Sequence, residues 1–295
     1  MTLLRRIFFS ADGRPRSGWV IAVFLLALGL LSAGMAWVLG PGGADSAQLD
    51  PRALSRQILV SWTQLAVVLV ATGVACWAGR QRLGDAHLQD PSALRRLGAG
   101  LLGGALIITA VAVVPWLFGE FAFQLSPEPP GAVATSLGLQ GLMLLPAATM
   151  EEVLVRGLVL QQLARGLGRV AAVGLTGLLF GAMHLGNPEA TAFGFANIVL
   201  VGFVFGGLTV RQGSLWAATG LHIAWNVLLG TFWGLPVSGF DFGLSVLEPT
   251  YVGHPLWTGG AFGPEASAVT TAVLALTLAV VLRIPVRGPE AAAAH

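Results

Sequence analysis

Two adjacent glutamates lie inside an apolar stretch of this chain, and an arginine follows one helical turn later. They are Glu151, Glu152 and Arg156, within residues 143–157. A carboxylate in the middle of a bilayer costs about 3 kcal/mol even on lenient insertion scales. Glu152 and Arg156 have the i,i+4 spacing of an ion pair on one helix face, which predicts a structural role for both. Glu151 points about 100° away on the same helix, so it is free to face a cavity.

Three more polar residues interrupt later apolar segments at helical spacing. His184 follows Phe180 by four residues, and Asn226 follows His222 by the same interval. With about 1.5 Å of rise per residue, these side chains and Glu151 lie roughly 15–20 Å from the arginine-bearing ends of their segments. The shared depth predicts one polar layer formed by three different helices.

The residue types in this layer suit hydrolysis of an amide. A glutamate and a histidine can bind and deprotonate water, and a second histidine with an asparagine can donate hydrogen bonds to an oxyanion. A metal site is the alternative, in which Glu151, His184 and His222 would bind zinc and water would complete the coordination. The spacing alone does not choose between zinc and no cofactor. A zincin-type His-Glu-x-x-His motif does not occur, and Ser238, in an outer segment, is assigned no catalytic role.

These motifs, in this order, resemble those of the CPBP family of intramembrane proteases, also called the Abi or type II CAAX-protease family. Residues 151–157 are similar to its Glu-Glu-x-x-x-Arg motif, residues 180–184 to Phe-x-x-x-His, and residues 222–226 to His-x-x-x-Asn. The resemblance covers about residues 143–230.

The resemblance implies a role for each site residue. Glu151 would be the general base, assisted by His184, and His222 with Asn226 would form the oxyanion site. Supporting roles would fall to Glu152 and Arg156. The family is often labelled a metalloprotease, but a metal-free glutamate mechanism has also been proposed for it. We favour the metal-free mechanism, with zinc as the alternative.

Composition places the site in a membrane protein. The chain is 55% hydrophobic and 10% charged, whereas soluble domains carry about 25% charged residues. All 16 basic residues are arginine and none forms a basic run, which argues against nucleic acid as a partner. The single cysteine excludes a disulfide framework. We therefore expect an all-α polytopic protein with an intramembrane polar cavity.

Eight apolar segments are candidates for transmembrane helices. They lie at about residues 17–40, 58–79, 97–119, 133–160, 170–186, 193–210, 214–232 and 266–284. With both termini cytoplasmic, every inner loop carries arginine, as the positive-inside rule requires. This predicts a multi-pass plasma-membrane protein, and the Ala-, Gly- and Arg-rich composition indicates a bacterial source.

The chain divides into three predicted regions. Residues 1–130 hold helices 1–3, residues 131–232 form the catalytic core with helices 4–7, and residues 233–295 hold an outer segment and the last helix. Within the outer region, residues 233–265 are interpreted as a loop rather than a lid. Two glycine pairs, at residues 100 and 104 and at residues 202 and 206, predict close helix packing.

Three functions fit these residues, and the first is favoured. An intramembrane endopeptidase would act on a membrane-associated peptide or protein, such as a leader or signalling peptide. The second is a non-proteolytic membrane scaffold or a bacteriocin-immunity type of protein. The third, a proton or cation transporter, is disfavoured because neither an inverted repeat nor paired broken helices occur. In a bacterium, a prenylated CAAX substrate is not expected. The oligomeric state does not follow from the sequence.

Overall fold

The computed structural model describes residues 13, 15–39 and 51–286. Its longer helices are α2 Ser17–Leu39, α3 Pro51–Ala78, α4 Ala93–Leu117, α5 Pro130–Glu152, α7 Arg169–Met183, α8 Ala192–Gln212, α9 Trp216–Val227 and α11 Ala268–Arg283. The shorter helical elements are η1 Leu83–Ala86, the π-helical η2 Val153–Val159, α6 Leu160–Leu167, the π-helical η3 Leu228–Phe232, α10 Pro255–Thr258, η4 Gly260–Phe262 and η5 Pro264–Ala266. Two strands, β1 Phe121–Leu125 and β2 Leu247–Tyr251, complete the fold.

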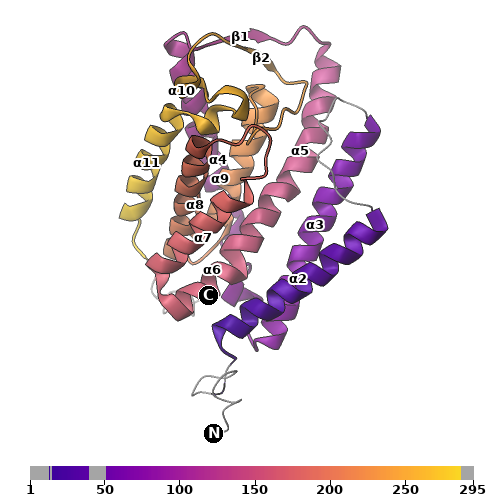
Figure 1. The fold of residues 1–295 in the computed structure, drawn as a ribbon, viewed down its shortest axis with the longest axis vertical. Helices are drawn as coiled ribbons and strands as arrows, with labels where there is room; N and C mark the ends of the chain where they lie inside the picture. Colours follow the sequence, from indigo (N-terminus) through magenta and orange to yellow (C-terminus); the bar gives the residue numbers. More distant parts are fainter. Residues whose placement is uncertain (1–12, 14, 40–50, 287–295) are drawn as a thin grey trace.

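The long helices run side by side as one bundle (Figure 1). At its lower end in Figure 1, α2 and α7 begin and α3 and α11 end; we call this the arginine-rich end, because Arg16, Arg80, Arg169 and Arg283 lie at those termini. The opposite end carries β1, β2 and α10, and we call it the strand end.

Each of the eight predicted apolar segments is helical, but they differ in their capacity to cross a membrane. By length and hydropathy, four helices of the described chain qualify: Ser17–Leu39, Leu54–Ala78, Ala93–Leu117 and Ala192–Gln212. Two further apolar helices, α7 and α11, are shorter. The helical membrane-type fold is therefore confirmed, whereas the count of eight spans stays a prediction.

The predicted all-α fold has one small addition, because β1 and β2 pair antiparallel at the strand end. Gly119, with φ of +77°, follows the end of α4 and turns the chain into β1. Phe121 faces Tyr251 across the ladder with ring centroids 5.2 Å apart. Such aromatic cross-strand pairs stabilise short ladders.

Glycines bring the central helices into backbone contact, as the sequence predicted. A Cβ on Gly100 would lie 2.1 Å from the Ala217 carbonyl oxygen of α9, and one on Gly104 would lie 2.5 Å from the Leu221 oxygen. A Cβ on Gly202 would lie 2.8 Å from the Cα of Gly177 in α7. The α4–α9 and α7–α8 contacts are thus too close for any side chain at these positions. They fix the relative height of the helices that carry the polar layer.

Residues 233–265, which we interpreted as a loop, are irregular up to residue 246 and then form β2, α10, η4 and the start of η5, and the segment is anchored to the bundle. The buried Gln140 of α5 donates hydrogen bonds from Nε2 to the Phe242 and Leu244 carbonyls, at 3.0 and 2.8 Å. Asn197 of α8 donates to the Glu265 carbonyl at 2.8 Å. Buried amides that satisfy loop carbonyls hold the segment against the helices. It therefore forms part of the wall around the polar layer.

Candidate active site

The glutamate pair ends α5 at the start of a π-helical turn. Arg156 donates from Nη1 to Glu152 Oε1 at 3.0 Å, and both side chains are completely buried. The guanidinium also donates to the Gly202 carbonyl at 3.3 Å, and its Cζ lies 4.2 Å from the centroid of the Phe180 ring. The predicted ion pair is thus confirmed. Its partners on α7 and α8 connect three helices through one cation.

Glu152 has a second partner that the sequence did not predict. His222 Nδ1 donates to the same Oε1 atom at 3.0 Å. The imidazole of His222 also stacks on Phe205, with ring centroids 5.1 Å apart and an angle of 25° between the planes. Glu152 therefore orients the histidine as well as compensating Arg156. Orientation of an imidazole through its Nδ1–H is a recurrent device in catalytic sites.

The ring of His184 is oriented by its own helix. This residue directly follows the last residue of α7, and its Nδ1–H donates to the Phe180 carbonyl at 2.8 Å. In the neutral ring, that bond leaves the Nε2 lone pair as an acceptor. The ring lies against Phe180, with centroids 4.8 Å apart. His184 thus presents a basic nitrogen to the polar layer.

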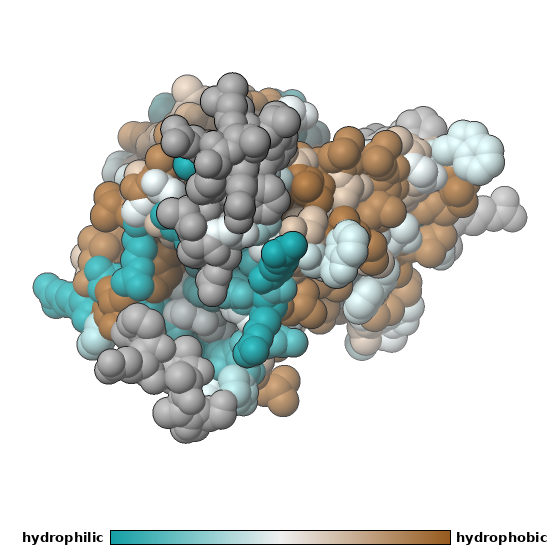
Figure 2. All heavy atoms as spheres, turned by 90° about the horizontal axis from the view of Figure 1, so that it is seen from below, coloured by the Kyte–Doolittle hydropathy of each residue, from teal (hydrophilic) through white to brown (hydrophobic). Residues whose placement is uncertain are grey.

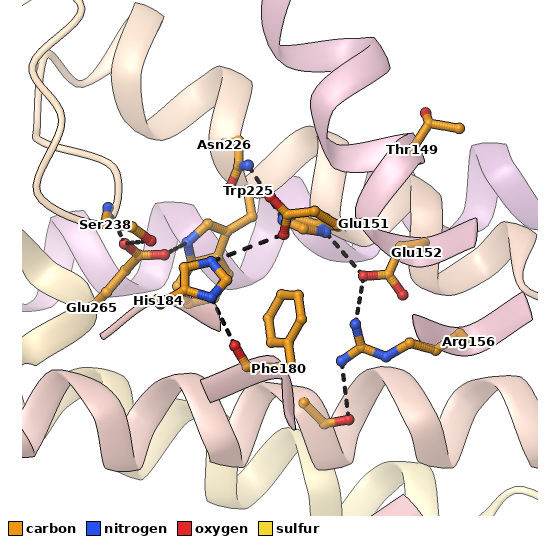
Figure 3. Close-up of polar contacts among 12 residues, drawn as sticks. Thr149, Glu151, Glu152, Arg156, Phe180, His184, Trp225, Asn226, Ser238 and Glu265 are labelled. Atoms are coloured by element: carbon orange, nitrogen blue, oxygen red, sulfur yellow. Dashed lines mark hydrogen bonds and ion pairs between the residues drawn. The ribbon is translucent and has the colours of Figure 1, made fainter. Parts of the chain in front are cut away.

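Glu151 lies where the two histidines meet, as predicted. Its Oε2 atom is 3.9 Å from His184 Nε2 and 3.9 Å from His222 Nε2 (Figure 3). These distances exceed a direct hydrogen bond, and Oε2 is buried with no hydrogen-bond partner among the described residues. Asn226 donates from Nδ2 to His222 Nε2 at 3.2 Å. Four of the predicted residues therefore converge on one point.

Three residues of the site were missed by sequence reasoning. Glu265 accepts hydrogen bonds from Trp225 Nε1 at 2.9 Å and from Ser238 Oγ at 2.8 Å, and also from the Ser238 backbone N–H. Figure 3 shows this carboxylate on the side of His184 away from Glu152. Burial raises the pKa of the Glu265 carboxyl, and the hydrogen bonds from Ser238 oppose that rise.

A weak signal for this group was present in the sequence. Glu265 directly precedes the last apolar segment, and Trp225 directly precedes Asn226. Ser238 has a φ of +49°, a conformation that non-glycine residues seldom adopt. The outer segment thus contributes directly to the site, whereas Ser238 had been assigned no role.

A pocket joins these groups. It is a small space of about 20 Å³, lined by Phe180, His184, Ile198, Val201, Phe205, His222, Trp225, Asn226, Ser238 and Glu265, and Glu151 lies outside this lining. Such a mixture of apolar wall and few convergent polar groups is typical of small-molecule and peptide sites. The polar layer therefore borders a space of about the size of one water molecule.

The donor set does not fit a catalytic zinc ion, which takes three protein ligands. His222 Nε2 accepts from Asn226 and its Nδ1 donates to Glu152, so both of its nitrogens are engaged. That leaves two atoms, Glu151 Oε2 and His184 Nε2, whose lone pairs are available to a metal ion. No group of three His, Cys, Asp or Glu among residues 13, 15–39 and 51–286 is placed to hold a metal ion.

Comparisons with known proteins agree with the motif resemblance. Residues 133–228 match one family model, described as Rce1-like: type II CAAX prenyl endopeptidase Rce1-like. The uncharacterized protein YyaK of Bacillus subtilis (strain 168) is 27% identical over 168 residues, which cover 55% of this chain and 56% of that protein. The chain thus matches only about half of the length of this relative. All six predicted site residues lie within the segment matched by the family model.

Proposed function

Because residues 133–228 form a domain of the Rce1-like type II CAAX prenyl endopeptidase family, we propose that this chain is an intramembrane endopeptidase. It hydrolyses a peptide bond of a membrane-associated protein or peptide. The observation that carries the proposal is the convergence of Glu151 Oε2 with the Nε2 atoms of His184 and His222, at 3.9 Å each. Of these three atoms, Glu151 Oε2 and His184 Nε2 are free to accept, and each can take a hydrogen bond from one water molecule between them.

The first half of the proposed reaction uses Glu151 and His184. The Glu151 carboxylate takes a proton from water while the Nε2 lone pair of His184 accepts a hydrogen bond from the same water. The resulting hydroxide attacks the carbonyl carbon of the scissile bond, and the carbonyl π electrons move to oxygen. Glu151 is then a carboxylic acid, and it passes this proton to the amide nitrogen as the carbon–nitrogen bond breaks.

The second requirement is stabilisation of the oxyanion, which we assign to Asn226, with His222 holding the Asn226 amide in place. The Asn226 amide has two N–H groups, and one of them contacts His222, which leaves the other for the substrate oxygen. Glu152, which contacts both Arg156 and His222 through Oε1, holds this side of the site in position. Donors fixed before the reaction stabilise developing charge without reorganisation.

We propose that the hydrolysis needs no metal. The engagement of both His222 nitrogens supports this, since zinc would have to displace Asn226. Elemental analysis of protein purified without chelators tests the point. Full activity at a zinc content far below one ion per chain is expected. Loss of activity on treatment with 1,10-phenanthroline, with recovery on adding zinc, would instead show that a metal is required and make Glu151, His184 and His222 its candidate ligands.

The decisive experiment compares the wild type with Glu151→Gln. Membranes from cells that express each form are labelled at new protein N-termini, and the cleaved peptides are then synthesised and incubated with purified protein. We expect Glu151→Gln to lower the cleavage rate at least a hundredfold, since general-base catalysis alone contributes about 10²–10⁴. Glu128→Gln, at an exposed position at the strand end, is the matched control and should keep full activity.

Retention of cleavage by Glu151→Gln would refute the assignment of the general base. Retention of a cellular phenotype together with absent cleavage in both forms would favour the non-proteolytic scaffold or immunity function. We propose that the substrates are leader or signalling peptides, and the labelling experiment identifies them.

A further inference from the structure

A second hollow lies at the arginine-rich end, away from the candidate active site. Its lining includes Arg16, Arg80, Arg82 and Arg165, which come from the start of α2, from the segment after α3 and from α6. Figure 2 looks onto this end and shows hydrophilic side chains gathered there, with apolar surface along the flanks. None of these arginines takes part in the proposed hydrolysis.

The lining is strongly cationic. Among the described residues that line the hollow, four are arginines and one, Asp85, carries a carboxylate. Asp85 Oδ1 is paired with Arg165 Nη2 at 2.9 Å. Arg80 and Arg82 are exposed and form no ion pair with any residue of the described chain. Excess positive charge in a concave lining attracts an anion from solution or from a membrane surface.

The polar groups of the hollow are also held in place. Gln162 Nε2 donates to Gln81 Oε1 at 2.7 Å, which links α6 to the segment that carries Arg80 and Arg82. Ser17 and Gly18, the first residues of the 23-residue helix α2, line the same hollow. The unpaired N–H groups of a helix N-terminus favour phosphate and other anions. Arginines and a helix N-terminus thus converge on one space.

The hollow lies at the ends of two apolar helices, and this position favours a lipid as the anion that it binds. It lies at the ends of α2 and α3, which are both long and apolar enough to cross a membrane. Farther along α2, Leu25 and Leu26 are 55% and 65% exposed, and they offer a surface for acyl chains. A ligand with a phosphate in the hollow and hydrocarbon along α2 would use both features. Basic pockets between membrane helices hold anionic headgroups in this way.

We propose that this hollow binds the phosphate of an anionic lipid headgroup through Arg80 and Arg82, with Arg16 and Arg165 completing the charge. The competing explanation for these arginines is the general excess of arginine on the inner side of membrane proteins, which does not require a lipid-binding site. Arg95 separates the two explanations. It is an exposed arginine near the start of α4 and does not line the hollow.

The test measures lipid binding by the full chain in a non-ionic detergent. Dioleoylphosphatidylglycerol, dioleoylphosphatidylcholine and inorganic phosphate are titrated separately, and bound ligand is counted by native mass spectrometry. We expect tight binding of phosphatidylglycerol and a loss of at least tenfold in affinity for R80Q/R82Q. R95Q should change affinity less than twofold. R80K/R82K keeps the charge and should keep most of the binding.

Each outcome decides the proposal. An equal loss of affinity in R95Q overturns the proposal, because it shows attraction by unspecific positive charge. Equal binding of phosphatidylcholine and phosphatidylglycerol also overturns it, because it shows that there is no anion site. Inorganic phosphate that binds as well as the lipid, with the same sensitivity to R80Q/R82Q, identifies a free phosphate as the source of the anion. The unfolding temperature of each variant without ligand is recorded as well, so that a misfolded variant is recognised. If R80Q/R82Q is misfolded, the lipid affinity of R80K/R82K is compared with that of the wild type instead.

Discussion

At the scale of single residues, the two adjacent glutamates have different surroundings. Glu152 is completely buried and contacts Arg156 and His222 through one oxygen. Glu151 is partly exposed and lies between His184 and His222. A carboxylate oxygen that already accepts from two buried partners has little capacity left to bind water. The proposed general base is therefore the glutamate with no ionic partner on its own helix.

Glu265 is the residue whose replacement tests the outer wall of the site. Glu265→Gln places an amide N–H group opposite the donors of Trp225 or Ser238. We expect a loss of at least tenfold in cleavage rate and faster proteolysis within residues 233–265, because a hydrogen bond to a charged group contributes about 1.5–3 kcal/mol.

The control for this variant lies in the same segment. Asp241→Asn makes the same change at an exposed carboxylate, which within the described part of the chain accepts one hydrogen bond, from Gly243 N–H. It should leave both cleavage and proteolysis unchanged. Equal behaviour of the two variants would show that Glu265 does not hold the wall in place.

At the scale of elements, the contact between α4 and α9 determines where His222 and Asn226 lie. Gly100→Ala would place a Cβ 2.1 Å from the Ala217 carbonyl oxygen, so the two helices must separate. We expect a destabilisation of about 1–3 kcal/mol or more, as in other overpacked cores, with reduced cleavage. Stability is measured by titration with dodecyl sulfate in mixed micelles.

Gly103 provides the comparison on the same helix. A Cβ there has no atom within 4 Å. Gly103→Ala should be neutral or stabilising by up to about 1 kcal/mol, because alanine is the better helix former. If Gly100→Ala were equally harmless, the close approach of α4 to α9 would not be required.

The turn that follows α3 contains a histidine with a pH-dependent effect on stability. Burial lowers the pKa of His87 to about 4, with a further contribution from the charge of Arg165. The folded state therefore disfavours the protonated ring, whereas the unfolded chain binds a proton below about pH 6.5. The neutral His87 ring therefore makes its full contribution to the free energy of unfolding above pH 6.5. This contribution, at most about 3 kcal/mol, is lost as the pH falls to about 4.

The measurement is the free energy of unfolding as a function of pH. His87 has a φ of +58°, and asparagine tolerates that conformation. His87→Asn should remove most of the loss of stability between pH 6.5 and 4. An unchanged pH dependence in this variant would assign the loss to other groups.

At the scale of the whole molecule, the arginine-rich end and the strand end predict the orientation in the membrane. The positive-inside rule places the arginine-rich end in the cytoplasm. Cys76 is the single cysteine of the chain and is buried, so Cys76→Ala gives a background for labelling. On that background, Val252→Cys at the strand end should react with an impermeant maleimide in intact cells, since Val252 is 64% exposed.

The opposite end supplies the matched position. Leu94, which is 85% exposed, lies near the start of α4. Leu94→Cys should react only after the membrane is permeabilised. The reverse pattern would contradict the proposed orientation, and with it the cytoplasmic location of both termini.

The polar layer could be predicted from the sequence because its residues lie in helices. Charged and amide side chains in apolar segments stand out, and the constant rise of a helix converts sequence position into depth. Glu151, His184, His222 and Asn226 were found in this way. The glycine contacts were also predictable, since small residues four positions apart permit close helix packing.

Only the tertiary structure decided the partners of these residues. His222 reaches Glu152 across 70 positions of the chain, and Glu265 reaches Trp225 across 40. Ser238 lies in no helix or strand and Glu265 in a three-residue turn of helix, so no sequence period shows which of these side chains face inward. A buried carboxylate in such a segment is recognised only when the hydrogen bonds that compensate its charge are seen. For that reason the sequence determined which helices carry the chemistry, and the packing of the outer segment determined what closes over it.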